Sequence, residues 1–273
     1  MLAVRTPTLP PATHTNCYAL GTGQLLIVEP APSDRSEQQA FVRWVRNMTS
    51  RGLRPLAIVC THHHGDHVGG AASISAELGL PLWAHAETSQ RMAGVRVARR
   101  LDDGDRIELG GPTEQTWVVL HTPGHAPGHV CLHERSAGTL VLGDMIASEG
   151  TILIAPGDGD MAEYLVQLRR LAALDARLGL PAHGEPIASP SVVLRKTHDH
   201  RLMREGKVMS AVASAGDRGA RLQQVLEKAY DDTPAALWPI ATLSLQAHLE
   251  KLVREQRVDT NGDRWYALDQ GRR

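Results

Sequence analysis

The chain has 273 residues, of which 42% are hydrophobic and 22% are charged, fractions that exclude an intrinsically disordered polypeptide. Its formal net charge of -1 excludes a strong overall attraction for polyanions, so any nucleic-acid contact would have to be local. The N-terminus has no apolar signal segment, and no run approaches the roughly 18 apolar residues of a membrane span. We therefore expect a cytoplasmic protein with no membrane partner.

The first half of the chain alternates between strand and helix patterns. Residues 16–28 predict two strands around a Gly-Thr-Gly turn, and residues 36–51 carry apolar side chains at the spacing of an amphipathic helix. Next come a predicted strand at 56–60, a helix at 71–78, a strand at 82–85 and a helix at 87–98. An Asp-Gly turn then predicts a hairpin.

The pattern restarts with strands at 116–122, 129–133 and 140–144 and a helix at 161–178. Two such halves predict an α/β (α+β) fold with four layers, in which two mixed sheets lie face to face with helices outside, an αβ/βα sandwich. We assign this domain to residues 1–190. The three cysteines are widely spaced and odd in number, so we expect reduced, buried thiols.

Beyond residue 190 the strand signal disappears until the end of the chain. Helices are predicted at 191–215, 218–230 and 235–255, followed by a short hairpin with an Asn-Gly turn. Helices followed by a small hairpin predict a winged-helix-like domain, which we assign to residues 191–273. This part of the chain carries a small excess of Lys and Arg over Asp and Glu.

The most informative motif is THHHGDH at residues 61–67, directly after a buried strand. Five of its side chains can bind a metal, and a chance match to this pattern is improbable. Downstream, His125 lies in TPGH, Asp144 in LVLGD and His183 in PAHG, each beside Gly or Pro where an element ends. Together these segments predict a dinuclear site.

We predict that His62, His64 and His125 bind one ion, that Asp66, His67 and His183 bind the other, and that Asp144 bridges them. Imidazole and carboxylate ligands suit two Zn²⁺ ions per chain, although Mn²⁺ or Fe²⁺ also bind such sets. Two adjacent cations generate a bridging hydroxide near neutral pH, which predicts hydrolysis. Asp66 is the expected catalytic residue, because its free oxygen can pass a proton to the leaving group.

The order of these motifs over residues 15–186 resembles the metallo-β-lactamase superfamily of hydrolases. The resemblance implies the same four-layer fold and the same seven ligands. One departure is Glu29, because many members have Asp near the end of an early strand. The bridging Asp144 argues against a true β-lactamase, since those enzymes generally lack it. The tail segments HDHRLMREGKV and SLQAHLEKLVREQRV resemble the β-lactamase-like protein 2 subgroup, in which a winged-helix-like region follows the hydrolase.

We therefore predict a dinuclear zinc hydrolase that cleaves an ester-type bond. The subgroup, in which an endoribonuclease is known, and the basic tail favour a phosphodiester such as single-stranded RNA. A glyoxalase-II-type thioesterase or a lactonase acting on a small-molecule ester or thioester is the alternative. Another class of function is a winged helix that binds nucleic acid or protein beside a structural metal site, and a di-iron oxidoreductase is a third. A homo-oligomer is compatible with the sequence.

Candidate substrate contacts are His63, between the ligands, and three side chains at helical spacing after the catalytic half, His200, Arg201 and Arg204. Arginine offers a planar fork for phosphate or carboxylate. A solvent-exposed helix face is the alternative for these three. His129 is expected either to orient the TPGH loop through a hydrogen bond or to be an ordinary strand residue.

Overall fold

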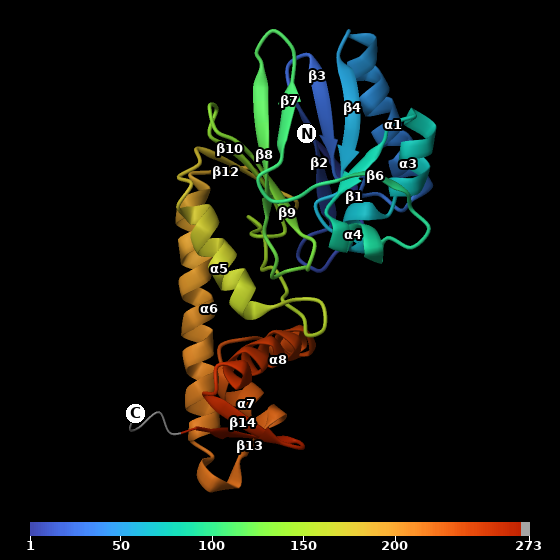
Figure 1. Ribbon diagram of the computed structural model, residues 1–273. Helices are drawn as coiled ribbons and strands as arrows, with labels where there is room; N and C mark the ends of the chain where they lie inside the picture. Colours follow the sequence, from blue (N-terminus) through green and yellow to red (C-terminus); the bar gives the residue numbers. More distant parts are fainter. Residues whose placement is uncertain (269–273) are drawn as a thin grey trace.

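The structure is a computed structural model that describes residues 1–268. Two sheets face each other at one end of the molecule, and a long helix, α6 (Pro190–Ala213), leads from them to a smaller C-terminal unit (Figure 1). The first sheet has the order β1-β2-β3-β4-β5-β6. Its strands are β1 (Leu2–Arg5), β2 (His14–Leu20), β3 (Gln24–Val28), β4 (Arg54–Val59), β5 (Leu82–Ala84) and β6 (Val97–Arg100). Pairing is antiparallel from β1 to β3 and parallel from β3 to β6.

The second sheet has the order β12-β11-β10-β9-β8-β7. Its strands are β7 (Arg106–Leu109), β8 (Gln115–His121), β9 (Val130–Glu134), β10 (Thr139–Gly143), β11 (Leu178–Pro181) and β12 (Ile187–Ala188). All neighbours pair antiparallel except β10 and β11, which run parallel. Strands β8, β10 and β11 each end next to a predicted ligand segment.

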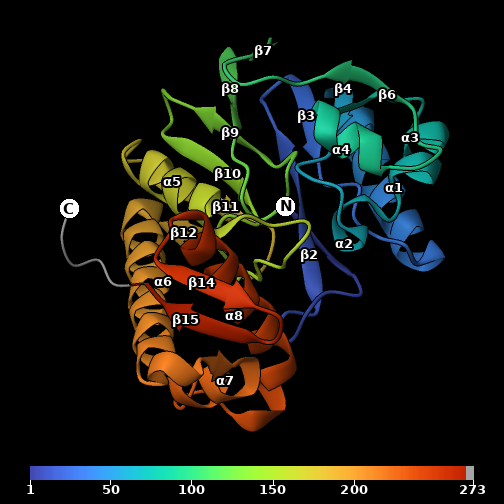
Figure 2. The ribbon, with the colours of Figure 1, turned by 60° about the horizontal axis from the view of Figure 1, so that its bottom comes forward.

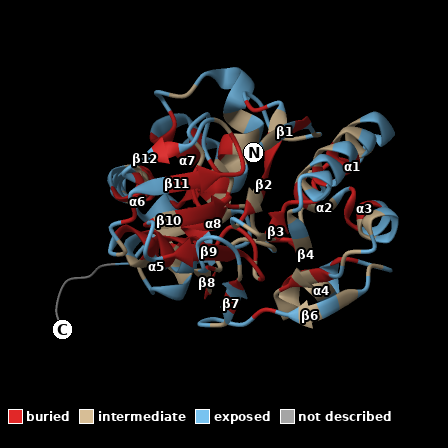
Figure 3. Ribbon diagram, turned by 90° about the horizontal axis from the view of Figure 1, so that it is seen from above, coloured by how far each residue is buried: buried red, intermediate tan, exposed pale blue. Residues whose placement is uncertain are grey.

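Side-chain alternation along the strands produces the layers. In β3, Leu26 and Val28 point into the core between the sheets, whereas Leu25 and Ile27 face the helices outside. Helices α1 (Arg35–Ser50) and α3 (Ala71–Leu78) cover the first sheet, and α5 (Met161–Ala172) and the start of α6 cover the second. Figure 3 shows buried central strands and helices with exposed outer faces. The predicted four-layer αβ/βα sandwich is confirmed.

The C-terminal unit has a hydrophobic core of its own, to which α6, α7 (Leu222–Ala229) and α8 (Trp238–Arg254) contribute. A small sheet of β13 (Ala220–Arg221), β15 (Arg264–Ala267) and β14 (Val258–Asn261) completes it (Figure 2). Two short 3-10 helices precede β13 and α8, at Gly216–Arg218 and Ala235–Leu237. This arrangement of helices with a terminal hairpin is the predicted winged helix. Helix α6 begins at Pro190, the residue at which we placed the domain boundary.

Three predicted helices are too long. The helix expected at 218–230 begins only at Leu222, because β13 occupies the two residues before it. The helix expected at 87–98 ends early as α4 (Ala86–Arg91), because Gly94 adopts φ of 74°, and β6 occupies the remainder. The helix expected at 161–178 ends at Ala172, and its last predicted residue begins β11 beside β10. Strand β1 was not predicted.

All three cysteines are free and buried, as expected. Within residues 1–268, no helix is long and apolar enough to cross a membrane.

Candidate metal centre

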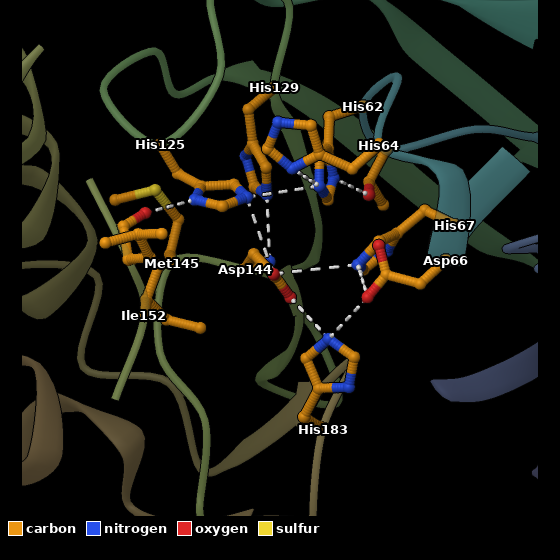
Figure 4. Close-up of polar contacts among 12 residues, drawn as sticks. His62, His64, Asp66, His67, His125, His129, Asp144, Met145, Ile152 and His183 are labelled. Carbon is orange, nitrogen blue, oxygen red and sulfur yellow. Dashed lines mark hydrogen bonds and ion pairs between the residues drawn. The ribbon is translucent and has the colours of Figure 1, made fainter. Parts of the chain in front are cut away.

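The seven predicted ligands come from four segments that meet at one edge of the two sheets (Figure 4). The segment after β4 supplies His62 and His64, and the one-turn helix α2 (Gly65–Val68) supplies Asp66 and His67. The other three follow β8, β10 and β11 and are His125, Asp144 and His183. Carboxyl ends of strands gather in this way in open α/β sheets, which explains why distant parts of the chain converge here.

The structure gathers these side chains into overlapping groups, two of which are the predicted triplets. His62, His64 and His125 have their ligand atoms within 4.8 Å of one another, and Asp66, His67 and His183 form a second group under the same limit. In the first triplet, Nε2 of His62 lies 3.0 Å from Nδ1 of His64 and 3.2 Å from Nε2 of His125. These are the two groups that the sequence predicted.

The Asp144 carboxylate lies between the triplets. Its Oδ2 is 3.4 Å from Nε2 of His125 and 3.6 Å from Nε2 of His67. Its Oδ1 is 3.4 Å from Nε2 of His183. One carboxylate therefore faces both groups, which is the placement that a bridging ligand needs.

Backbone carbonyls hold two of the imidazoles. The Nδ1–H of His125 donates to the carbonyl of Leu153 at 2.9 Å, and the Nδ1–H of His183 donates to the carbonyl of His14 at 2.9 Å. Since the Nδ1 of each ring faces a carbonyl, its Nε2 is the nitrogen aimed at the centre. Such hydrogen bonds fix the ring orientation that a metal ligand requires.

Carboxylates hold the other rings. Glu29, which is buried, accepts from Nδ1 of His67 at 3.2 Å and from the hydroxyl of Thr61, whose oxygen in turn lies 3.0 Å from Nδ1 of His62. Asp158 accepts from Nε2 of His64 at 2.7 Å, which leaves Nδ1 of that ring facing the centre. Glu29 thus fills the position at which the sequence departs from the family pattern. In the sequence, Asp158 lies in a Gly-Asp-Gly-Asp stretch that is typical of a loop near a metal but lacks the spacing of a calcium site, and no partner for it could be predicted.

His129 supports Asp144 from behind. Its Nε2 accepts the backbone N–H of Asp144 at 3.0 Å, so its Nδ1 carries the proton and donates to the hydroxyl of Thr122 at 2.8 Å. Of the two expectations for His129, the structure favours the orienting one, because Thr122 begins the TPGH loop. Gly143 makes room for this ring, since a Cβ there would lie 2.5 Å from Nε2 of His129.

Charge and burial shift the pKa values of the predicted ligands in opposite directions. Burial lowers the pKa of His62 well below its usual value and lowers the pKa of His125 to about 4, so both rings are neutral. Burial also lowers the pKa of His67, but Asp144 and Glu29 outweigh it and raise that pKa well above the usual value. Burial raises the pKa of Asp144, yet the neighbouring His67 and His183 hold it well below the usual range.

The donor set fits a pair of divalent cations. Among the described residues, Nε2 of His67 and Oδ1 of Asp144 are buried atoms without a hydrogen-bond partner. Leaving buried polar atoms unpaired is costly, and a cation between the triplets would satisfy both. Five imidazole nitrogens and two carboxylates in a confined space also match the ligands that Zn²⁺ prefers.

The four proposed substrate contacts lie outside the ligand set, although the ring of His63 packs beside that of His64, with centroids 4.8 Å apart. His63 points to Asp158 at 3.4 Å, and His200 lies on the exposed face of α6. Arg201 is buried and donates to Oγ1 of Thr151 at 3.1 Å and to the carbonyl of Ile152. Arg204 is also buried; it donates to the carbonyl of Ala229 and, at 2.8 Å, to Asp232. None of the four is among the side chains that line the cavity over the ligands.

A cavity of about 330 Å³ opens over the ligands. Its walls are two loops, residues 7–12, which include three prolines, and residues 147–155. Its charged lining is acidic, with Asp66, Asp144, Glu149 and Asp158, and no Lys or Arg of residues 1–268 lines it. The cavity therefore offers apolar walls around a floor of metal-binding groups.

Comparisons with known families agree with this geometry. The Metallo-beta-lactamase superfamily profile matches residues 10–183, more than half of the chain and all seven predicted ligands. The Beta-lactamase associated winged helix domain profile matches residues 222–265.

Individual relatives cover nearly the whole chain. A beta-lactamase-like protein 2 homolog of Drosophila melanogaster is 27% identical over 254 residues, which cover 89% of this chain and 84% of that protein. An atrochrysone carboxyl ACP thioesterase of Pseudocercospora fijiensis is 25% identical over 269 residues, covering 93% and 75%. The crystal structure of a beta-lactamase domain protein from Burkholderia ambifaria has the same fold, with a TM-score of 0.80, 22% identity and coverage of 98% and 90%. The chain belongs to the metallo-beta-lactamase superfamily, as a hydrolase whose catalytic fold is followed by a beta-lactamase-associated winged helix domain.

Proposed function

We propose that this hydrolase cleaves a small thioester or ester with an apolar acyl group, using two divalent cations. The observation that carries the proposal is the cavity over the ligands, which has apolar walls, an acidic rim and no cationic side chain from residues 1–268. Apolar surface of this kind binds an acyl chain, while the few polar groups on the floor fix its orientation.

In this proposal one ion is held by His62, His64 and His125, and the other by Asp66, His67 and His183, with Asp144 shared. Zn²⁺ suits this set best, with Mn²⁺ and Fe²⁺ as the alternatives. When bound, such a pair lowers the pKa of water and stabilises negative charge on the attacked and leaving atoms.

Asp66 has the position of a proton carrier. Its carboxylate lines the cavity, and its Oδ2 lies 3.6 Å from Nε2 of His183 and 3.7 Å from Nε2 of His67. One oxygen can therefore act as a ligand while the other faces the substrate. We infer that this second oxygen accepts a proton from the attacking water and returns it to the leaving sulfur or oxygen as the acyl bond breaks.

The acidic rim weighs against the phosphodiester that the basic tail favoured. A single strand of RNA brings a phosphate at every nucleotide, and proteins that bind such strands line the path with Lys and Arg. Here Glu149 and Asp158 would instead face the neighbouring phosphates. The thioesterase among the relatives supports the choice of a thioester, which is uncharged at the bond that breaks.

The test is a comparison of kcat/KM on the zinc-loaded enzyme. The substrates are an uncharged acyl thioester of N-acetylcysteamine, an acyl-homoserine lactone, bis(p-nitrophenyl) phosphate and a short single-stranded RNA. We expect the thioester or the lactone to be hydrolysed with the highest kcat/KM, and Asp66→Asn to lower kcat by about 10²- to 10⁴-fold. If RNA is the best substrate, or if Asp66→Asn retains full activity, the proposal is wrong.

A further inference from the structure

Two arginines of the C-terminal half hold the two ends of one stretch of the catalytic domain, residues 151–160, which we name the positioning segment. We propose that the winged helix domain, through Arg201 and Arg254, holds this segment so that it orients the His62, His64 and His125 triplet. Asp158 is the positioning residue within the segment. The inference depends on the two-cation site proposed above.

The inner side of the positioning segment reaches two of the three imidazoles. The carbonyl of Leu153 accepts from Nδ1 of His125 at 2.9 Å, and Oδ2 of Asp158 accepts from Nε2 of His64 at 2.7 Å. The backbone N–H of Asp160 also donates to the carbonyl of Gly124 at 2.8 Å, one residue before His125. A shift of the segment would therefore move both rings.

The outer side of the segment is held from the C-terminal half. At its start, the buried guanidinium of Arg201 on α6 donates to Oγ1 of Thr151 at 3.1 Å and to the carbonyl of Ile152. At its end, Arg254 on α8 makes two parallel bonds to the carboxylate of Asp160, at 2.6 and 2.8 Å. A paired fork of this kind fixes orientation as well as distance.

The ion pair between Arg254 and Asp160 affects the geometry of the positioning segment more than the stability of the protein. Its side chains are 55% and 31% exposed, and ion pairs in contact with water contribute little to the free energy of unfolding. Asp160 also caps α5 by accepting from the backbone N–H of Ala162 at 2.8 Å, so this helix remains capped when the arginine is removed. Loss of Arg254 should therefore loosen the segment without unfolding the domain.

Asp158 determines which nitrogen of His64 faces the centre. As the acceptor for Nε2–H, it keeps the proton on that side and leaves Nδ1 free to bind a cation. Without an acceptor, the ring can rotate or take the other tautomer. Loss of a hydrogen bond of this type typically weakens metal binding about 10- to 100-fold.

The experiment measures Zn²⁺ binding by the full chain in competition with a chromogenic chelator, which gives the number of equivalents and the Kd of each. We expect Asp158→Ala to weaken one of the two equivalents by about 10- to 100-fold and to leave the other unchanged. Asp158→Asn keeps an amide oxygen as acceptor and should restore most of this loss. Arg254→Ala should weaken the same equivalent by a smaller factor, about threefold, with Arg254→Lys in between.

Arg46→Ala is the matched control, because it removes a comparably exposed ion pair, with Glu77, on the far side of the catalytic domain; it should bind both equivalents normally. Thermal unfolding of the metal-free variants reports whether they fold as the wild type does. Wild-type affinity of Asp158→Ala for both equivalents would overturn the inference, as would equal weakening by Arg46→Ala and Arg254→Ala. If the wild type binds two equivalents but hydrolyses no thioester or ester, the proposed substrate fails and the inference stands.

Discussion

The imidazoles of the metal centre are each held by the nitrogen that faces away from it, and small residues make room for this support. Gly124 is one of them. It adopts φ of 133°, and a Cβ at this position would lie 2.4 Å from the backbone nitrogen of Tyr164 on α5. Only glycine combines this backbone angle with so close a contact. The placement of His125 therefore depends on its neighbour having no side chain.

We predict that Gly124→Ala destabilises the protein by about 3 kcal/mol, because crowding and backbone strain both act there. It should also weaken Zn²⁺ binding, since the displaced loop carries His125. Urea denaturation and chelator competition measure the two effects. Gly104→Ala is the control, with φ of 86° but no atom within 4 Å of the added Cβ. Equal losses for the two variants would show that strain alone accounts for the effect and that the contact with Tyr164 is unimportant.

The sequence predicted which side chains gather at the centre better than it predicted the groups that support them. Ligands are readable because a metal demands particular side chains at short spacings, as in residues 61–67. Asp158 belongs to a Gly-Asp-Gly-Asp stretch and is separated from His64 by more than ninety residues. A single hydrogen bond across that distance leaves no local pattern. For Glu29, the sequence shows its position after a buried strand but not its hydrogen bond with His67.

At the scale of elements, α6 and α8 meet around a buried carboxylate, Glu205. It forms an ion pair with Lys251 at 2.8 Å and accepts a hydrogen bond from Arg257 at 2.8 Å, and His248 lies 3.7 Å away. Burial raises the pKa of Glu205, but the neighbouring His248 and Lys251 outweigh it and lower the pKa to about 2. The charged form is therefore favoured in the folded state, and this preference stabilises the contact between the two helices.

We predict that Glu205→Gln lowers the free energy of unfolding at pH 7 by about 3 kcal/mol, because it breaks a buried ion pair and leaves Lys251 without its carboxylate partner there. Because the folded-state pKa is depressed, the stabilisation is complete above the unfolded pKa of about 4.5 and is lost as the pH falls toward 2. Urea denaturation at pH 7, 4 and 3 should show the gap between wild type and variant narrowing. The exposed Glu255, which also pairs with Lys251, is the control, and Glu255→Gln should cost less than about 0.5 kcal/mol. If the difference in free energy of unfolding between wild type and Glu205→Gln does not change with pH, the lowered pKa of Glu205 in the folded state is wrong.

Helices and strands were predicted correctly where the local spacing of apolar residues determines them. They were missed where pairing with a strand distant in the sequence determines them. Helix α1 starts at an Asp34 cap that accepts from the backbone of Ser36 and Glu37, a signal visible in the sequence. Strands β6 and β11 instead follow shortly after helices and owe their extended form to parallel partners, β5 and β10. No pattern within a short window contains that information.

For the whole molecule, cation binding at the proposed centre would be coupled to folding. The two halves of the catalytic domain contribute ligands to both triplets, so a bound cation ties together segments that separate when the chain unfolds. A ligand that binds only the folded state stabilises it by about 4 kcal/mol at 1,000 times its Kd.

We predict that Zn²⁺ raises the midpoint of thermal unfolding and that a chelator reverses the shift. Mg²⁺, which prefers oxygen ligands, should have little effect at the same concentration. Asp144→Asn should reduce the rise due to Zn²⁺, because the carboxylate that faces both triplets is lost. Scanning calorimetry with and without each metal measures this. Equal stabilisation of the wild type and Asp144→Asn would mean that the two triplets bind independently of Asp144.

Helix α6 runs unbroken for 24 residues, with its proline at the first position, and it contributes to the cores of both domains. Its length therefore acts as a spacer. Inserting or deleting one residue in its middle would rotate everything beyond by roughly 100° and shift it by about 1.5 Å. Arg254 would then no longer face Asp160. The surface loops can change length without such an effect. The relative orientation of the two domains, in contrast, depends on the present length of this helix.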